Sequence, residues 1–80
     1  MGIKKAVLLR IKKLCKERNL KLNALANLSG VTPSTVYSMF DEDRYDIGIV
    51  SLKKLCDGLE IDIIEFFNDD LFKNMEQEIK

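Results

Sequence analysis

The sequence predicts an all-α fold, and three observations support this prediction. Apolar residues recur every three or four positions in five consecutive segments, which is the period of a helix buried on one face. Residues that favour helix ends lie between the segments, and no stretch shows the alternation typical of a half-buried strand. With 80 residues and 46% hydrophobic content, the chain has the size and apolar content of one globular domain.

The first two helices are expected at residues 4–18 and 22–28. In the first segment the apolar residues lie on one side and the lysines on the other, which indicates an amphipathic helix. Gly30 follows the second segment and can adopt the left-handed conformation that ends a helix. The apolar positions of these two segments are Val7, Ile11, Leu14, Cys15, Leu22, Leu25, Ala26 and Leu28.

A third helix is expected at residues 33–40, followed by a polar loop at 41–48. Thr32 can cap this helix with its hydroxyl, and Pro33 suits the first helical position because its missing N–H would be unpaired there anyway. The residues expected to be buried are Val36, Met39 and Phe40.

Two more helices are expected at residues 49–59 and from Ile61-Asp62 to residue 67, with Asp62 as the N-cap of the second. Their expected inward residues are Ile49, Leu52, Leu55, Cys56, Leu59, Ile63, Phe66 and Phe67. We therefore expect a domain at residues 1–67 and a helical C-terminal tail at 68–80. The tail either packs on the domain or serves as an arm for a partner, through an apolar stripe of Leu71, Phe72, Met75 and Ile79.

The charges divide the chain into two halves, although the formal net charge is zero. Residues 1–40 hold eight basic groups and one acid, whereas residues 41–80 hold five basic and twelve acidic groups. This asymmetry favours a positive face that can meet phosphate and a negative face elsewhere. The alternative is that the charges only solvate helix surfaces.

Several classes of protein do not fit the composition. No segment has the roughly 18 apolar residues of a transmembrane helix, and the apolar run near the start is too short for a signal peptide, so we expect a cytoplasmic protein. Cys15 and Cys56 fall at apolar positions and are interpreted as core residues. Without histidine, a Cys-x-x-Cys pair or a glycine-rich phosphate loop, we expect no metal, no cofactor and no enzymatic activity.

Residues 22–39 match what two short helices crossing at a tight turn require. Counted from Leu22, the fifth residue is the small Ala26, the ninth is Gly30 and the fifteenth is Val36. The fourth, tenth and eighteenth residues are all apolar. These six matches, without an insertion, predict a helix-turn-helix. The three apolar residues are Leu25, Val31 and Met39.

On these residues the chain resembles the Cro and cI repressor type of helix-turn-helix, also called the XRE family. The resemblance covers residues 8–67 and includes the segments Arg10–Leu14, Ser34–Val36, Ser51–Leu59 and Ile64–Phe67. It implies a compact five-helix, lambda-repressor-like fold and a small transcriptional regulator, most simply a repressor. It also implies that the protein binds double-stranded DNA as a homodimer, with helix 33–40 in the major groove. No membrane or small-molecule partner is expected.

The resemblance also implies which residues touch DNA. Side chains of the third helix face the bases, where hydroxyls can bond base edges and a threonine methyl can touch thymine. Lys21 and Asn23, at the start of the second helix, face phosphate, as do Arg44 and Tyr45 in the loop. The residues assigned to the third-helix site are Thr32, Pro33, Ser34, Thr35, Tyr37 and Ser38.

Three features differ from the family pattern. Leu22 replaces a frequent glutamine, and Asp41-Glu42-Asp43 replaces a neutral and basic segment, which weakens attraction to phosphate. Cys15 and Phe40 replace a frequent arginine–glutamate pair and are expected to touch in the core. The acidic segment leaves open an alternative: a protein-interaction module that has lost DNA reading. Dimerisation is expected through Leu71, Phe72, Met75 and Ile79, although these four residues fit completion of the monomer core equally well.

Overall fold

The computed structural model describes residues 1–43 and 46–79, and these contain helices and no strands. The expected all-α, five-helix fold is confirmed. The helices are α1 (Ile3–Glu17), α2 (Leu22–Ser29), α3 (Pro33–Met39), α4 (Ile49–Gly58) and α5 (Ile63–Phe67), followed by the short 3-10 helix η1 (Asp70–Phe72).

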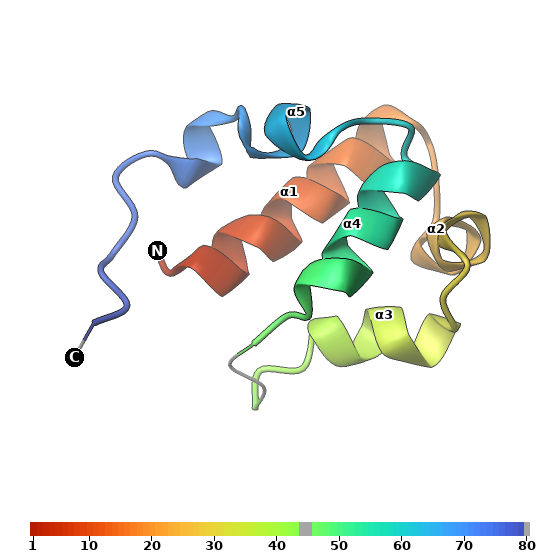
Figure 1. Ribbon diagram of the computed structural model, residues 1–80, viewed down its shortest axis with the longest axis horizontal. Helices are drawn as coiled ribbons and strands as arrows, with labels where there is room; N and C mark the ends of the chain where they lie inside the picture. Colours follow the sequence, from red (N-terminus) through yellow and green to blue (C-terminus); the bar gives the residue numbers. More distant parts are fainter. Residues whose placement is uncertain (44–45, 80) are drawn as a thin grey trace.

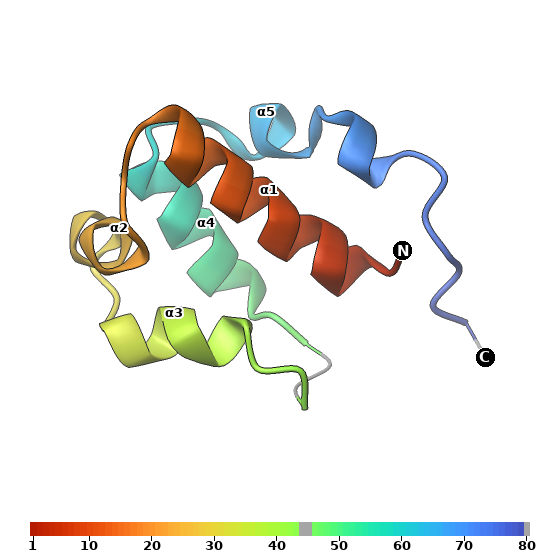
Figure 2. The same ribbon diagram turned by 180° about the vertical axis from the view of Figure 1, so that it is seen from behind.

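The long helices α1 and α4 lie side by side, and the shorter helices surround them (Figure 1). Helix α2 lies across one end of this pair. Helix α3 runs below α4 in the view of Figure 1. From behind, α5 and the tail are seen to follow α1 back towards its first residue (Figure 2). The two chain ends therefore lie on the same side of the molecule.

Both cysteines lie in the core, as expected, and burial raises the pKa of each thiol. Phe40 packs against the core from its edge, with the Lys12 ammonium 5.3 Å from its ring centroid. A direct contact between Cys15 and Phe40 stays a prediction. The buried apolar residues are Ala6, Val7, Ile11, Leu14, Cys15, Leu25, Ala26, Val36, Met39, Leu52, Leu55, Cys56, Leu59, Ile61 and Phe66.

One expected inward residue lies outside the core. Ile49 is 73% exposed, and its neighbour Val50 is also largely exposed. The helical period places Ile49 on the same stripe as Leu52, but Gly48 and Ser51 are the residues of this first turn that border the hollow beside α3, and Ile49 faces solvent. The prediction that Ile49 is buried was wrong because periodicity gives a direction and not a partner.

The tail is not the continuous helix that the sequence predicted. Asp69 caps only the single turn of η1, which ends when Lys73 adopts an extended conformation (ψ 143°), and Asn74 is then left-handed (φ 59°). Phe72 packs with Phe66 and Phe67, its ring centroid 4.8 Å from that of Phe67. A segment this short gains too little from local helix formation to remain helical without a packed face.

Candidate nucleic-acid interface

The turn between α2 and α3 is built by three residues in the predicted way. Gly30 has φ 69°, and the next residue, Val31, donates its N–H to Ala26 O at 3.1 Å. Thr32 is the N-cap of α3, where its hydroxyl oxygen accepts from Thr35 N at 3.3 Å, and Pro33 is the first helical residue. Local chemistry therefore fixes where α3 begins and how it leaves the turn.

Helix α3 presents one side to solvent and turns the other towards α4. Pro33, Ser34 and Tyr37 are exposed, with 53% of Tyr37 accessible, and no side chain of the described residues covers this strip. Thr35 and Ser38 are half-buried and line a small hollow of about 200 Å³ beside the start of α4. The six residues predicted on this helix thus divide into an exposed strip and a hollow.

Thr32 is exposed but its hydroxyl is already engaged. Its Oγ1 lies 3.0 Å from Ser34 Oγ and 2.9 Å from Thr35 Oγ1. A hydroxyl that holds a helix cap and two neighbours has little bonding capacity left for a ligand. Ser34 and Thr35 can each rotate towards solvent without breaking the backbone cap, so they are better placed to bind DNA than Thr32.

The start of α2 has the features of a phosphate contact. Lys21 is its N-cap residue, and no side chain among the described residues caps the helix. Lys21 and Asn23 are both exposed, so a cation and an amide flank free backbone N–H groups at the positive end of the helix dipole. Arg44 and Tyr45, the two expected loop contacts, lie outside the described residues.

The start of α4 was not among the residues predicted from the sequence. Gly48 occupies its N-cap position without a side-chain cap in the described part of the chain, and Ser51 faces the hollow shared with Thr35 and Ser38. The exposed Ile49 and Val50 lie at the same helix start. Gly48 was a detectable signal, because glycine is among the residues that favour the N-cap position.

The charges around this surface are mixed. Four lysines of α1 are exposed, but Arg10, counted among the basic groups of the first half, is buried and cannot serve a surface. Asp41, Glu42, Asp43 and Asp46 are all exposed after α3. The exposed lysines of α1 are Lys5, Lys12, Lys13 and Lys16.

Arg10 instead joins α1 to α5 and the tail. Its Nε donates to Phe66 O at 2.8 Å, its Nη2 to Glu65 O at 3.0 Å and its Nη1 to Asp69 Oδ2 at 3.1 Å. Lys13 reaches the same carboxylate oxygen at 2.7 Å, and Leu71 N donates to the other at 2.9 Å. The hydrogen bond from Lys13, helped by the Leu71 amide and the Arg10 charge, lowers the pKa of Asp69 below its ordinary value.

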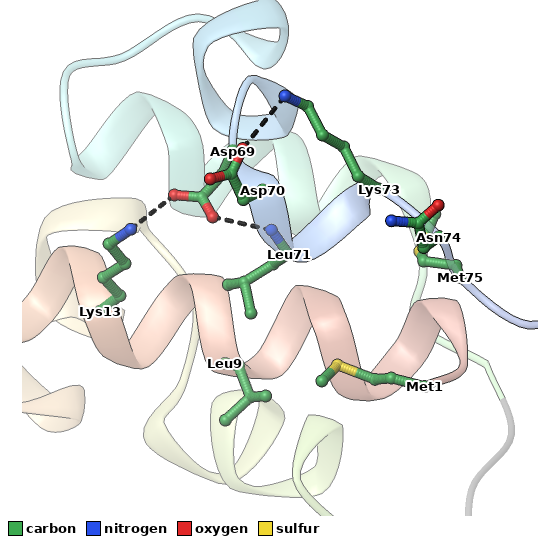
Figure 3. A pocket seen from close by; sticks show the side chains of 9 residues that line it. All are labelled: Met1, Leu9, Lys13, Asp69, Asp70, Leu71, Lys73, Asn74 and Met75. Carbon is green, nitrogen blue, oxygen red and sulfur yellow. Dashed lines mark hydrogen bonds and ion pairs between the residues drawn. The ribbon is translucent and has the colours of Figure 1, made fainter.

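A second hollow, of about 560 Å³, lies between α1 and the tail and is separate from the α3 surface (Figure 3). Leu71 points towards α1, while Lys13 and Lys73 bond the two aspartates at its rim. Of the four residues expected in a dimer, Leu71, Phe72 and Met75 are partly buried, and Ile79 is 87% exposed. They therefore do not form one exposed stripe.

Another apolar surface that the sequence did not single out lies on α5. Ile64 is 78% exposed and borders a shallow hollow with Ile63, Phe67 and Asn68. Ile64 follows Ile63 directly, and two adjacent isoleucines on one short helix cannot both face the same core. The adjacent isoleucines could therefore have predicted one exposed apolar residue on this helix.

Within the described residues, no helix is long and apolar enough to cross a membrane. A comparison with functionally curated proteins gives no match. Among solved structures, the crystal structure of prophage Lp1 protein 11 superimposes with a TM-score of 0.81 at 28% sequence identity, over 94% of this chain and 100% of that one. The family model of the Cro/C1-type HTH DNA-binding domain matches residues 10–70. The match includes the whole α2–α3 unit described above, and the chain belongs to the Cro/C1-type helix-turn-helix DNA-binding family.

Proposed function

We propose that this protein is a sequence-specific, double-stranded-DNA-binding transcriptional regulator, acting as a repressor, and that α3 enters the major groove. The observation that carries the proposal is the exposed strip of α3, held at a fixed angle by the Gly30 turn and the Thr32 cap. A helix with one free side and a rigid entry is what reading base edges requires.

The side chains of the exposed strip, together with Thr35 and Ser38 beside the hollow, define how the DNA sequence is read. Ser34 and Thr35 offer hydroxyls that donate or accept at base edges, and the Thr35 methyl can touch a thymine methyl. Tyr37 reaches further, to a base edge or a phosphate, and Pro33 and Ser38 contribute surface at either end. No residue of α3 is an arginine, lysine, glutamine or asparagine. Discrimination therefore depends on hydroxyl and methyl contacts and on DNA shape.

Phosphate contacts position the helix. Lys21 and Asn23, at the uncapped start of α2, are assigned to one phosphate, and Arg44 and Tyr45 to the backbone beyond α3. The exposed acids at residues 41–43 and 46 oppose these contacts, so the affinity is lower than that of a regulator with a basic loop.

A homodimer would place two α3 helices on paired half-sites. The exposed Ile64 on α5 is a better centre for the twofold contact than the expected stripe, since Leu71 and Phe72 are already partly covered. A monomeric mass at high concentration would contradict the dimer.

The second candidate is a protein-interaction module on the same fold. The four exposed carboxylates after α3 favour it, because they offer a basic partner a concentrated negative surface. In that case a partner protein co-purifies with the chain, and Ser34→Ala or Tyr37→Phe leaves its function unchanged.

Selection of bound duplexes from a random pool, repeated at two salt concentrations, tests the proposal. An enriched sequence whose affinity falls as salt rises supports it, and absence of binding to any duplex at low salt contradicts it. On the selected duplex, Lys21→Gln should weaken binding several-fold and reduce the salt slope by about 1. Lys54→Gln, the same change at an exposed lysine of α4, is the matched control and should leave both unchanged.

A further inference from the structure

The end of the tail is bonded to the start of α1. Glu76 N donates to Met1 O at 3.1 Å, and Glu76 Oε1 accepts from Met1 N at 3.2 Å. Two residues later, Glu78 Oε2 accepts from Ile3 N, the first amide of α1, at 3.2 Å. These contacts join residues about 75 positions apart in the sequence.

No side chain near the start of α1 caps this helix as Glu78 does. Its N-cap is Gly2, which has no side chain, and its first turn contains no acidic residue. A carboxylate is the group that the positive end of a helix dipole attracts. A Cβ at Gly2 would lie 3.1 Å from Glu78 Oε2, so the glycine gives the carboxylate room to approach.

The same glutamate lies beside the far end of α3. Glu78 shares a hollow of about 490 Å³ with Phe40, which follows α3, and with Lys5 and Lys12 of α1. Glu42, one of the acids after α3, lines it too. A phosphate backbone that passes the end of α3 therefore meets both the lysines and the tail's carboxylate.

From these contacts we propose that residues 73–79 are an acidic strap that competes with DNA phosphate for the start of α1. This inference rests on the DNA binding proposed above. In the free protein, Glu76 and Glu78 bind at the start of α1 and partly neutralise the positive charge of the nearby lysines. When DNA binds, a phosphate replaces Glu78 at the Ile3 amide and gains attraction from Lys5 and Lys12.

The strap is held weakly enough to leave. Glu76 and Glu78 are exposed, and exposed ionic contacts contribute little to stability and are screened by salt. By contrast, Asp69 is held by Arg10 and Lys13, so the part of the tail before residue 73 stays fixed. The strap is thus a pair of weakly held carboxylates that follows an anchored part of the tail.

The test compares two double variants of the full chain. Glu76→Gln/Glu78→Gln removes the charge of the strap, and Glu60→Gln/Glu65→Gln is a control that removes the same charge from exposed sites near α5. We expect the strap variant to bind the selected duplex about fivefold more tightly than the control at low salt, because the weak competing contacts are lost. The difference in affinity should narrow as salt is raised, because salt screens the competing carboxylates, so the strap variant has the steeper salt slope.

Amide exchange gives a readout that does not need DNA. The Ile3 amide should exchange faster in Glu76→Gln/Glu78→Gln than in the control, since a neutral amide oxygen is a weaker acceptor than a carboxylate. Unchanged exchange would overturn the assignment of Glu78 as the cap.

Each binding outcome decides something. If wild type binds DNA and both double variants match in affinity and slope, the strap is overturned while the DNA-binding function stands. If only the strap variant binds, both proposals gain support. If no form binds any duplex at low salt, both are overturned.

Discussion

At the scale of single residues, Arg10 makes the contacts that organise the C-terminal part of the chain. Its side chain is buried, and its three nitrogens bond two carbonyls of α5 and the Asp69 carboxylate. A buried cation is stable only when its charge and donors are satisfied, and here all three partners come from residues 65–69. Arg10 therefore holds α5 and the start of the tail against α1.

Replacing Arg10 should be costly. In Arg10→Met the side chain still fills space, but the carbonyls of Glu65 and Phe66 lose their donor and Asp69 keeps only Lys13 and the Leu71 amide. We expect the free energy of unfolding to fall by about 3 kcal/mol, the cost of breaking a buried pair by removing one partner. Urea unfolding at pH 7 measures it.

The matched control for Arg10 is Lys13→Met, because Lys13 bonds the same carboxylate but is half exposed. Its loss should cost less than about 1 kcal/mol. Equal losses for the two variants would show that Arg10 has no special role.

Asp69 should also give the stability a defined pH dependence. Its pKa in the folded chain is lowered, so the ionised form stabilises the fold at every pH above the unfolded pKa of about 3.9. That contribution is lost as the pH falls below this value towards the folded pKa. The stability difference between wild type and Asp69→Asn should be constant from pH 6 to 8 and shrink below pH 4, as measured by urea unfolding at each pH. A difference that is undiminished at pH 3 would contradict this role.

The residues that the sequence predicted well are those whose partners are close along the chain. Gly30, Thr32 and Asp62 act within three or four positions, so spacing alone identified them. The partners of Arg10 lie 55 to 59 positions away, and no local pattern records that. Arg10 was therefore counted with the surface charges.

At the scale of elements, α2 and α4 approach one another very closely at Ser29 and Gly58. A Cβ added at Gly58 would lie 2.1 Å from Ser29 Oγ and 3.1 Å from Ser29 N. The backbone atom cannot move aside as a flexible side chain can, so the packing of α2 on α4 requires glycine at this position.

Substitutions at Gly58 and Ser29 should show separately how close packing and hydrogen bonding affect stability at this contact. Gly58→Ala is expected to lower the free energy of unfolding by about 1–3 kcal/mol through overpacking. Ser29→Ala should be neutral or slightly stabilising, since the buried Ser29 Oγ has no hydrogen-bond partner among the described residues. Thermal or urea unfolding of the two variants measures both effects. A destabilised Ser29→Ala would show that the hydroxyl has a partner in solution.

The elements that the sequence misjudged are those at the edges of the core. The order and approximate bounds of α1 to α5 follow from apolar periodicity and caps, which act within each segment. The apolar stripe continues into the start of α4 and into the tail, but periodicity does not reveal where covering elements end. Ile49 and the segment after η1 are exposed or irregular for that reason.

At the scale of the whole molecule, the opposite charges of the two halves meet along α1. The tail carries carboxylates back along the lysine-bearing helix, through Asp69 and then Glu76 and Glu78. The positive half is thus partly neutralised by the chain itself. This arrangement, with the acids after α3, explains why we expect DNA binding that is weak and strongly dependent on salt.

The division of α3 into an exposed strip and a hollow makes a further prediction about specificity. Tyr37→Phe and Ser34→Ala should lower affinity for the selected duplex more than for a random one, because they remove groups assigned to base edges. Ser38→Ala, on the half-buried side, is the comparison. Competition binding measures the ratio of the affinities for the selected and the random duplex. Equal effects on both duplexes would contradict base contacts by Ser34 and Tyr37 and would indicate contacts to phosphate instead.

The central claim is that α2 and α3 meet duplex DNA. It is tested most directly by titrating the isotopically labelled chain with the selected duplex and following its amide NMR signals. We expect the largest changes at residues 21–24 and 34–38, and we expect them to diminish as salt is raised. Changes confined to α5 or to the acidic residues 41–43, or no changes at low salt, would contradict it.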